Sequence, residues 1–134
     1  MSKSVPEGWH SITPRLVTDD VAGLVAFLKH AFAATGEYRE DRPSEIRIGD
    51  SLILISEVGV RKFMPAFLYV YLDDVDAVYQ RAMDAGAESI EQPQDMPYGD
   101  RRAMIKDPGG NTWQIATHNE KAFRAFLNKG SSEN

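Results

Sequence analysis

The chain has 134 residues, 43% of them hydrophobic, which predicts a single domain with a real core rather than a disordered polypeptide. Its net charge of −5 argues against nucleic acid or an anionic membrane surface as a partner, and the absence of cysteine excludes disulfides and thiolate chemistry. No apolar run approaches the ~20 residues that a membrane-spanning helix needs, and the N-terminus lacks the apolar core of a signal peptide, so we expect a soluble cytoplasmic protein.

In chain order, the spacing of apolar residues predicts strands and helices. Period-two alternation of β-branched and aromatic residues indicates the strands, and apolar residues three and four apart indicate the helices. The segments 35–45 and 88–96 have room for further short strands. The predicted elements are a strand at 12–17, a helix after Asp20, strands at 45–48, 52–56 and 67–72, a helix after Asp74, strands at 102–107 and 112–118, and a helix over 119–128.

Two segments of the chain have the same pattern. LVTDDVAGLVAFLKHAF (16–32) and VYLDDVDAVYQRAMDAG (70–86) each run from an apolar strand end through Asp-Asp-Val into a helix. Asp19 or Asp20 can cap the first helix, and Asp73 or Asp74 the second, by accepting hydrogen bonds from backbone N–H groups. A turn and an apolar strand follow each helix, so the same order of elements occurs twice, as in an internal repeat.

This repeat predicts an α+β fold, with helices on one side of mostly antiparallel sheet. We expect one domain over 1–134. Within it, the first module covers about 9–60, the second covers about 64–120, and a C-terminal helix and tail follow at 119–134.

The strand at 67–72 has two contrasting faces, one aliphatic and one aromatic. The aliphatic face suits packing under helices. The aromatic face, joined by a few polar side chains from other strands, resembles the mostly apolar wall of a small-molecule pocket. A surface buried against a partner subunit would look the same, so alternation alone leaves both interpretations open. The predicted ligand-binding face holds Thr13, Arg15, Ile53, Phe67, Tyr69, Tyr71, Gln114 and His118.

Several motifs, in this order, resemble one known family. ITPRLVTDD, AFLKHAF, IRIGDSLILISE, LYVYLDDVDAVYQRAMDAGAE and YGDRRAMIKDPGGNTWQIATH together are similar to the PhnB-like branch of the glyoxalase/bleomycin resistance/extradiol dioxygenase superfamily, also called vicinal oxygen chelate proteins. The match covers about residues 9–120. The resemblance implies paired βαβββ modules, each a curled mixed sheet with its helix on the outer face. It also implies a ligand bound in the cup and a homodimer.

Metal-dependent relatives place a ligand on the first and last strand of each module. The resemblance puts the first-strand position, typically His, at Thr13 and Phe67, and the last-strand position, typically Glu, at Ile53 and Gln114. Isoleucine and phenylalanine cannot coordinate a metal, and a neutral glutamine is a weak ligand beside carboxylate or imidazole. We therefore predict neither a metal ion nor a cofactor.

The remaining polar motifs are less informative. The three histidines fit no local metal motif. In the Tyr98–Arg101 stretch, Arg101 or Arg102 can meet an anionic ligand through paired hydrogen bonds. An ion pair with Asp100 that shapes the turn is the favoured interpretation.

Together these observations predict a metal-independent protein that binds a small molecule, with sequestration of a ligand or drug as its activity. The net negative charge suits a cationic ligand, to which aromatic ring faces would add cation–π attraction. One alternative is an enzyme of the lyase, isomerase or dioxygenase type whose non-standard site uses Glu45, Glu57 or His118. Another is an interaction protein whose aromatic face is a dimer surface. The sequence leaves open the ligand, any catalysis, and whether modules pair within a chain or between subunits.

Overall fold

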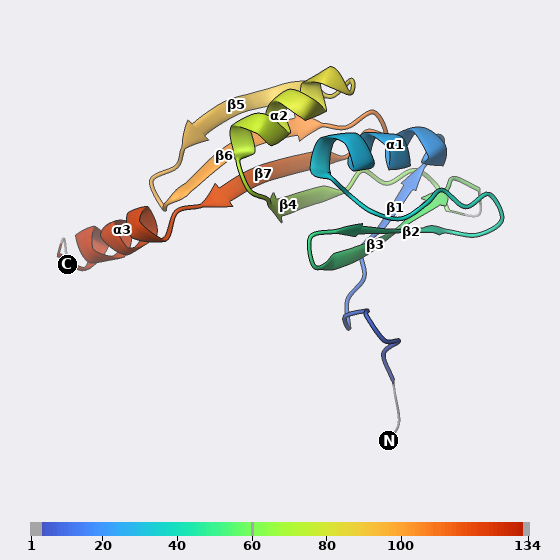
Figure 1. Cartoon of the computed structure of the whole chain (residues 1–134), viewed down its shortest axis with the longest axis horizontal. Coiled ribbons are helices and arrows are strands. Elements are labelled where there is room, and N and C mark those ends of the chain that lie inside the picture. Colours follow the sequence, from blue (N-terminus) through green and yellow to red (C-terminus); the bar gives the residue numbers. More distant parts are fainter. Residues whose placement is uncertain (1–3, 60, 133–134) are drawn as a thin grey trace.

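Ten helices and strands make up the part of the chain that the structure, a computed structural model, describes, namely residues 4–59 and 61–132. In chain order they are β1 (Arg15–Thr18), α1 (Val21–Phe32), β2 (Ser44–Ile48), β3 (Ser51–Glu57), β4 (Phe67–Tyr71), α2 (Val75–Asp84), β5 (Glu88–Asp95), β6 (Asp100–Lys106), β7 (Thr112–His118) and α3 (Glu120–Ser132). Figure 1 shows two sheets with α1 and α2 on the same face of the molecule. The α+β prediction is therefore confirmed.

The two sheets repeat one topology. Their strand orders are β1-β3-β2 and β4-β7-β6-β5, and the first strand of each sheet pairs parallel with the last strand of its module. The remaining pairs are antiparallel. β5 supplies a fourth strand in the second module, whereas its counterpart in the first is a single bridge between Thr35 and Arg47. The predicted repeat is thus present, with the first module the smaller one.

Of the two aspartates predicted as possible caps for each of α1 and α2, the second one, Asp20 and Asp74, is the cap. The side chain of Asp20 accepts a hydrogen bond from the backbone N–H of Gly23 at 2.9 Å, and that of Asp74 accepts one from Ala77 at 3.2 Å. Each bond satisfies one of the N–H groups that a helix start leaves without an internal partner. These two acidic residues therefore serve the helices, which explains their position in the repeat.

One hydrophobic core joins the two modules beneath the helices. α1 packs against α2, and buried side chains of α1 also contact both sheets. Phe32, at the end of α1, meets Trp113 of β7 edge to face, with ring centroids 5.0 Å apart. Because this aromatic pair connects elements of different modules, the halves share their core instead of folding around separate ones.

The structure corrects the predicted faces of β3. Ile53 and Ile55 are 4% and 0% exposed and lie in the core, whereas Leu52 and Leu54 lie on the opposite face. The parallel register with β1 sets Ile55 opposite Leu16, which fixes this phase. The sequence could not decide it because both faces of this strand are apolar, and a one-residue change in phase exchanges them.

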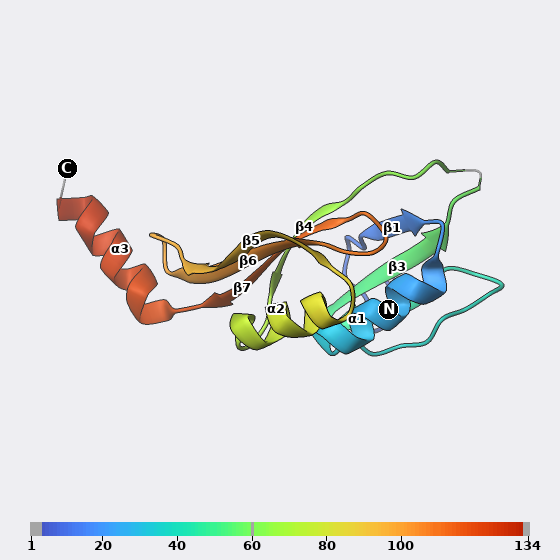
Figure 2. The same ribbon diagram turned by 90° about the horizontal axis from the view of Figure 1, so that it is seen from above.

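Two element ends also differ from the predictions. The first strand begins at Arg15 rather than at residue 12, and Ile12 is 84% exposed. The last helix runs on to Ser132 and leads away from both sheets, as Figures 1 and 2 show.

None of the helices in the described ranges combines the length and apolar character needed to cross a membrane.

Candidate functional site

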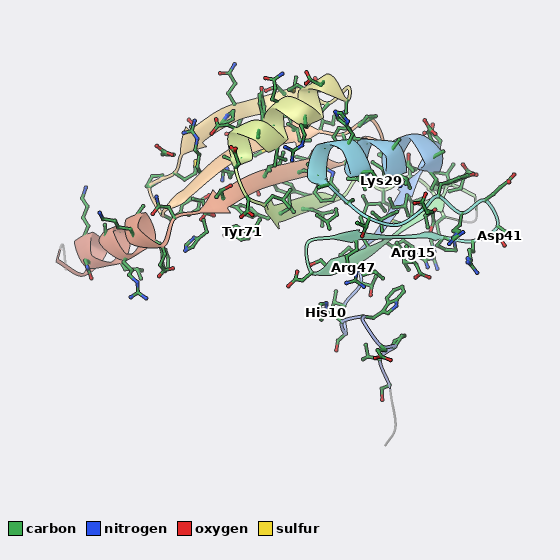
Figure 3. The ribbon with its side chains drawn as sticks, in the orientation of Figure 1. His10, Arg15, Lys29, Asp41, Arg47 and Tyr71 are labelled. Carbon is green, nitrogen blue, oxygen red and sulfur yellow. The ribbon has the colours of Figure 1, made fainter. Side chains whose placement is uncertain are left out.

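The aromatic face predicted on β4 lies open on the side of the sheet away from α2. Phe67, Tyr69 and Tyr71 are 67%, 38% and 59% exposed, whereas the alternate residues Leu68 and Val70 pack against the core. The rings of Tyr69 and Tyr71 stand 5.2 Å apart between centroids. Figure 3 shows Tyr71 on this open side. Strand alternation thus separates a packing face from an exposed aromatic face, as the sequence predicted.

Neighbouring strands extend this face. In the strand register, Tyr69 stands opposite Gln114 of β7, and Gln114 stands opposite Met104 of β6. The next row runs from Tyr71 through Ala116 to Arg102. Aromatic, thioether and aliphatic side chains therefore form most of the surface, and an amide and a guanidinium interrupt it. This composition is typical of the walls of small-molecule sites.

A buried carboxylate, Asp100, holds the tyrosines in place. It is 3% exposed, and its Oδ2 accepts hydrogen bonds from the hydroxyls of Tyr69 at 2.6 Å and Tyr71 at 2.9 Å. Its Oδ1 lies 3.0 Å from Nδ1 of His118. The other ring nitrogen of His118 lies 2.9 Å from Glu120 at the start of α3. One buried anion, Asp100, therefore holds both exposed tyrosine rings in place through their hydroxyl groups.

The ionisation states follow from these bonds. Burial favours the neutral form of Asp100, but the hydrogen bonds from Tyr69, His118 and Tyr71 outweigh it and hold the pKa of Asp100 below its usual value. Burial and the bonds to Asp100 raise the pKa of both tyrosines. Hydrogen bonds to Asp100 and Glu120 raise the pKa of His118. The site therefore holds an ionised aspartate, two neutral tyrosines and a histidine that favours its charged form.

A second branch of the network runs across the sheet. Nη1 of Arg102 donates to the hydroxyl of Tyr98 at 3.0 Å, and Nη2 donates to Glu91 at 3.1 Å. The Tyr98 hydroxyl in turn lies 3.3 Å from that of Tyr69. Arg102 is therefore held by Tyr98 and by Glu91, and its positive charge is paired with the Glu91 carboxylate.

The predicted residues of the first module take no part in the described hydrogen bonds of this network. Arg15 is exposed at the start of β1 and forms no ion pair with any residue in the described ranges, and Thr13 precedes the strand. Ile53 borders a groove of about 340 Å³ between the β2–β3 turn and β4, together with Tyr69 and Tyr71. Ile53 therefore lies near Tyr69 and Tyr71, although its side chain belongs to the core-facing side of its own sheet.

The chain resembles known proteins in its sequence. The glyoxalase/bleomycin resistance protein/dioxygenase superfamily matches residues 9–115. The chain belongs to this superfamily. An uncharacterized protein of Mycobacterium bovis is 28% identical, over 78% of this chain and 81% of its own length.

Solved structures agree on the superfamily fold. TioX from Micromonospora sp. ML1 has a TM-score of 0.71 and 21% identity, covering 81% of this chain and 98% of its own. A glyoxalase/bleomycin resistance protein/dioxygenase family enzyme from Burkholderia phytofirmans has a TM-score of 0.67 and 21% identity, covering 78% and 94%. At these identities the likeness concerns the fold alone.

The side chains at the expected metal positions of this superfamily do not fit a metal ion. Arg15 and Tyr69 each lie five residues before a helix-capping aspartate, and they stand opposite Leu54 and Gln114 respectively. Leu54, not Ile53, is therefore the counterpart of Gln114 in the first module. Leucine has no donor atom, nor has Phe67, and a bound metal needs three or four good ligands. Among the described residues, no three His, Asp or Glu side chains come together to hold one.

Sequence reasoning missed the role of Asp100 at the centre of the network. It favoured an ion pair of Asp100 with Arg101 or Arg102, but Arg101 binds Asp76 and Asp95 on the opposite face of β6, and Arg102 binds Glu91. Strand alternation could have indicated this role. Asp100 stands opposite His118 in the strand register and so lies on the same face as the tyrosines. A cavity larger than the groove at Ile53, about 910 Å³, lies elsewhere, beside the β6–β7 turn, and Phe63 contributes to its lining.

Proposed function

We propose that this superfamily member binds a small aromatic molecule on the face of β4, β7 and β6 without the help of a metal ion, and thereby sequesters it. The observation that carries the proposal is the exposed Tyr69–Tyr71 pair held from below by buried Asp100. Exposed aromatic rings in a fixed arrangement bind flat ligands at little cost in conformational entropy. The side chains at the metal positions provide no donor set for Lewis-acid chemistry, which supports binding as the activity.

A homodimer is the second part of the proposal. The aromatic face is open in a single chain, since both helices cover the opposite side of the sheets (Figure 1). Phe67 and Tyr71 are more than half exposed, and exposed apolar patches on this scale are typical of interfaces or ligand sites. A second copy laid against this face would close the cup around a ligand.

Membership of the PhnB-like branch is a third part of the proposal. The order of the YGDR and ATH motifs supports it.

One observation favours an enzyme as the second candidate. His118 lies between Asp100 and Glu120, and both bonds stabilise its protonated ring. A histidine whose pKa is raised in this way is better suited to donate a proton than to accept one near neutral pH. In this alternative the tyrosine face would hold the substrate and His118 would act as a general acid.

A titration with a planar cationic dye tests the binding proposal. Protein freed of metals by a chelator would be titrated with proflavine, and the dye's fluorescence polarisation measured. We expect saturable binding that Tyr71→Ala weakens about tenfold, because a ring face over a cation contributes roughly 1 kcal/mol or more. Phe63→Ala, at the larger cavity, is the matched control and should leave the affinity unchanged. Binding that depends on added metal, or that responds to Phe63 instead, would count against the proposal.

Light scattering after size-exclusion chromatography tests the dimer. The expected mass is twice the 15.0 kDa of the chain. A monomer at every concentration would remove the dimer from the proposal but leave the ligand face to the titration.

A further inference from the structure

We propose that the aromatic face selects ligands that donate a hydrogen bond to the hydroxyl oxygen of Tyr71, as protonated amines and amino-substituted aromatic cations do, and that it rejects anions. This inference rests on the proposed binding function and names the ligand class of the same site. Its basis is the direction of the hydrogen bonds around Asp100, because that direction decides which atoms remain available to a ligand.

Asp100 takes up the hydroxyl protons of both tyrosines. A carboxylate in its ionised form only accepts hydrogen bonds, and a tyrosine hydroxyl has a single proton to donate. Tyr69 and Tyr71 both approach Oδ2 of Asp100, at 2.6 and 2.9 Å, so each of them donates to it. Neither hydroxyl then has a proton left for a ligand, and both can act towards a ligand only as acceptors.

The acceptor position of Tyr69 is partly filled already. Arg102 can only donate, so the Tyr98 hydroxyl accepts from it and has its own proton free. That proton can reach the Tyr69 oxygen 3.3 Å away. The donors thus run in one order, from Arg102 through Tyr98 and Tyr69 to Asp100.

The hydroxyl oxygen of Tyr71 has no such donor among the described residues. Its hydroxyl donates to Asp100, and the neighbouring hydroxyl of Tyr69, which could otherwise donate to it, has its own proton on Asp100. The Tyr71 side chain is more than half exposed. A ligand lying against the rings can therefore place an N–H group on this oxygen. A carboxylate or phosphate in the same position would meet a lone pair and would be repelled.

The charges around the face agree with this direction. Its two cations are each paired, Arg102 with Glu91 and His118 with Asp100 and Glu120, and Arg124 also pairs with Glu120, so that cations and carboxylates balance. Nε of Arg102 lacks a partner, but the atom is buried and out of a ligand's reach. These paired groups therefore offer an anion no free positive charge, whereas a cation gains from the ring faces.

The test uses three flat tricyclic probes of similar size. Proflavine is a cation with amino N–H donors, 10-methylacridine orange (methylated on both amino groups and on the ring nitrogen) is a cation without any N–H, and 9-anthracenecarboxylate is an anion. Each would be titrated against the wild-type protein, Tyr71→Phe, and the matched control Tyr38→Phe, whose exposed ring lies outside this face. Circular dichroism would verify that all three proteins are folded alike.

We expect the wild-type protein to prefer proflavine over the methylated dye by about tenfold, as for one hydrogen bond from a charged donor. Tyr71→Phe should bring the ratio of the two affinities close to one while the methylated dye still binds, and Tyr38→Phe should leave the ratio unchanged. Equal binding of both dyes, or a ratio that Tyr71→Phe does not change, would overturn the inference and leave the binding function standing. Tighter binding of the anion would also overturn it. If none of the probes binds, the proposed function fails together with the inference.

Discussion

The two modules share their architecture but differ in what they carry on it. Each has a parallel pair of first and last strands, an aspartate that caps the helix, and an antiparallel partner strand. At equivalent places the first module has Arg15 and Leu54 where the second has Tyr69 and Gln114. Among the residues that the structure describes, only those of the second module include a buried carboxylate that binds two tyrosines and a histidine. The repeat therefore fixes the backbone, and the polar network distinguishes the half with the candidate site.

The largest expected effect on stability concerns the core contact between the two modules. Replacing Phe32 by Ala removes a buried ring that packs on Trp113, and we expect a loss of about 4 kcal/mol in the free energy of unfolding. Urea denaturation followed by circular dichroism measures it. Because the core is shared, both modules should still unfold in one transition. Phe126→Ala, at a half-exposed position of α3, should change stability little. Two separate transitions would show that the modules are independent.

The second-largest expected effect distinguishes the turns that precede the last strand of each module. Asp107 is 4% exposed and accepts hydrogen bonds from the backbone N–H of Asn111 at 3.0 Å and the indole of Trp113 at 2.7 Å. Asp107→Ala leaves buried donors without partners and should cost about 3 kcal/mol. Asp50 is exposed in the corresponding turn of the first module. Its carboxylate accepts a hydrogen bond from the neighbouring Ser51, and the bond from Arg47 goes to its backbone carbonyl, so Asp50→Ala should be nearly neutral. Equal urea midpoints for the two variants would contradict this contrast.

Two turn glycines give a smaller contrast. Gly99 has φ +105°, and a Cβ there would stand 2.6 Å from the backbone nitrogen of Phe123, so Gly99→Ala should displace the start of α3 and cost about 2 kcal/mol. Gly49 has φ +58° with no atom within 4 Å of a Cβ, so Gly49→Ala should cost about 1 kcal/mol from backbone strain alone. Thermal denaturation compares them. A larger loss at Gly49 would mean that α3 does not pack at Gly99 as described.

The smallest effect is the pH dependence that His118 adds to the second module. Its pKa in the folded protein lies above the ordinary value of 6.5, mainly through its bond to Asp100. The folded state therefore binds the proton more tightly than the unfolded chain. This contribution is fully present below pH 6.5 and is lost as the pH rises through the raised pKa. Compared with the wild type, His118→Gln should thus lose more stability in mildly acidic than in alkaline buffer. A gap in melting temperature that widens towards alkaline pH would contradict this sign.

Much of the fold could be predicted because its signals are local. Alternation located the six predicted strands to within a few residues, and Asp20 and Asp74 indicated both helix starts. The phase of β3 could not be predicted in this way, because its two faces are equally apolar and only pairing with β1 decides between them.

The candidate site was predictable only in part for a similar reason. The aromatic row of β4 follows from alternation within one strand. Asp100 belongs to the site through the register between β6 and β7, which pairs it with His118. Arg101, its neighbour in sequence, faces the other side of the sheet and binds Asp76. Sequence proximity suggested the wrong partner, and the sheet supplied the right one.

The central claim is that the face of Tyr69 and Tyr71 binds a small molecule without a metal ion. Titration of proflavine against chelator-treated protein, repeated after zinc, nickel or iron is added back, tests it most directly. The account predicts saturable binding with the same affinity in all cases, and about tenfold weaker binding for Tyr71→Ala. Binding that occurs only with metal present, or that Tyr71→Ala leaves unchanged, would contradict it.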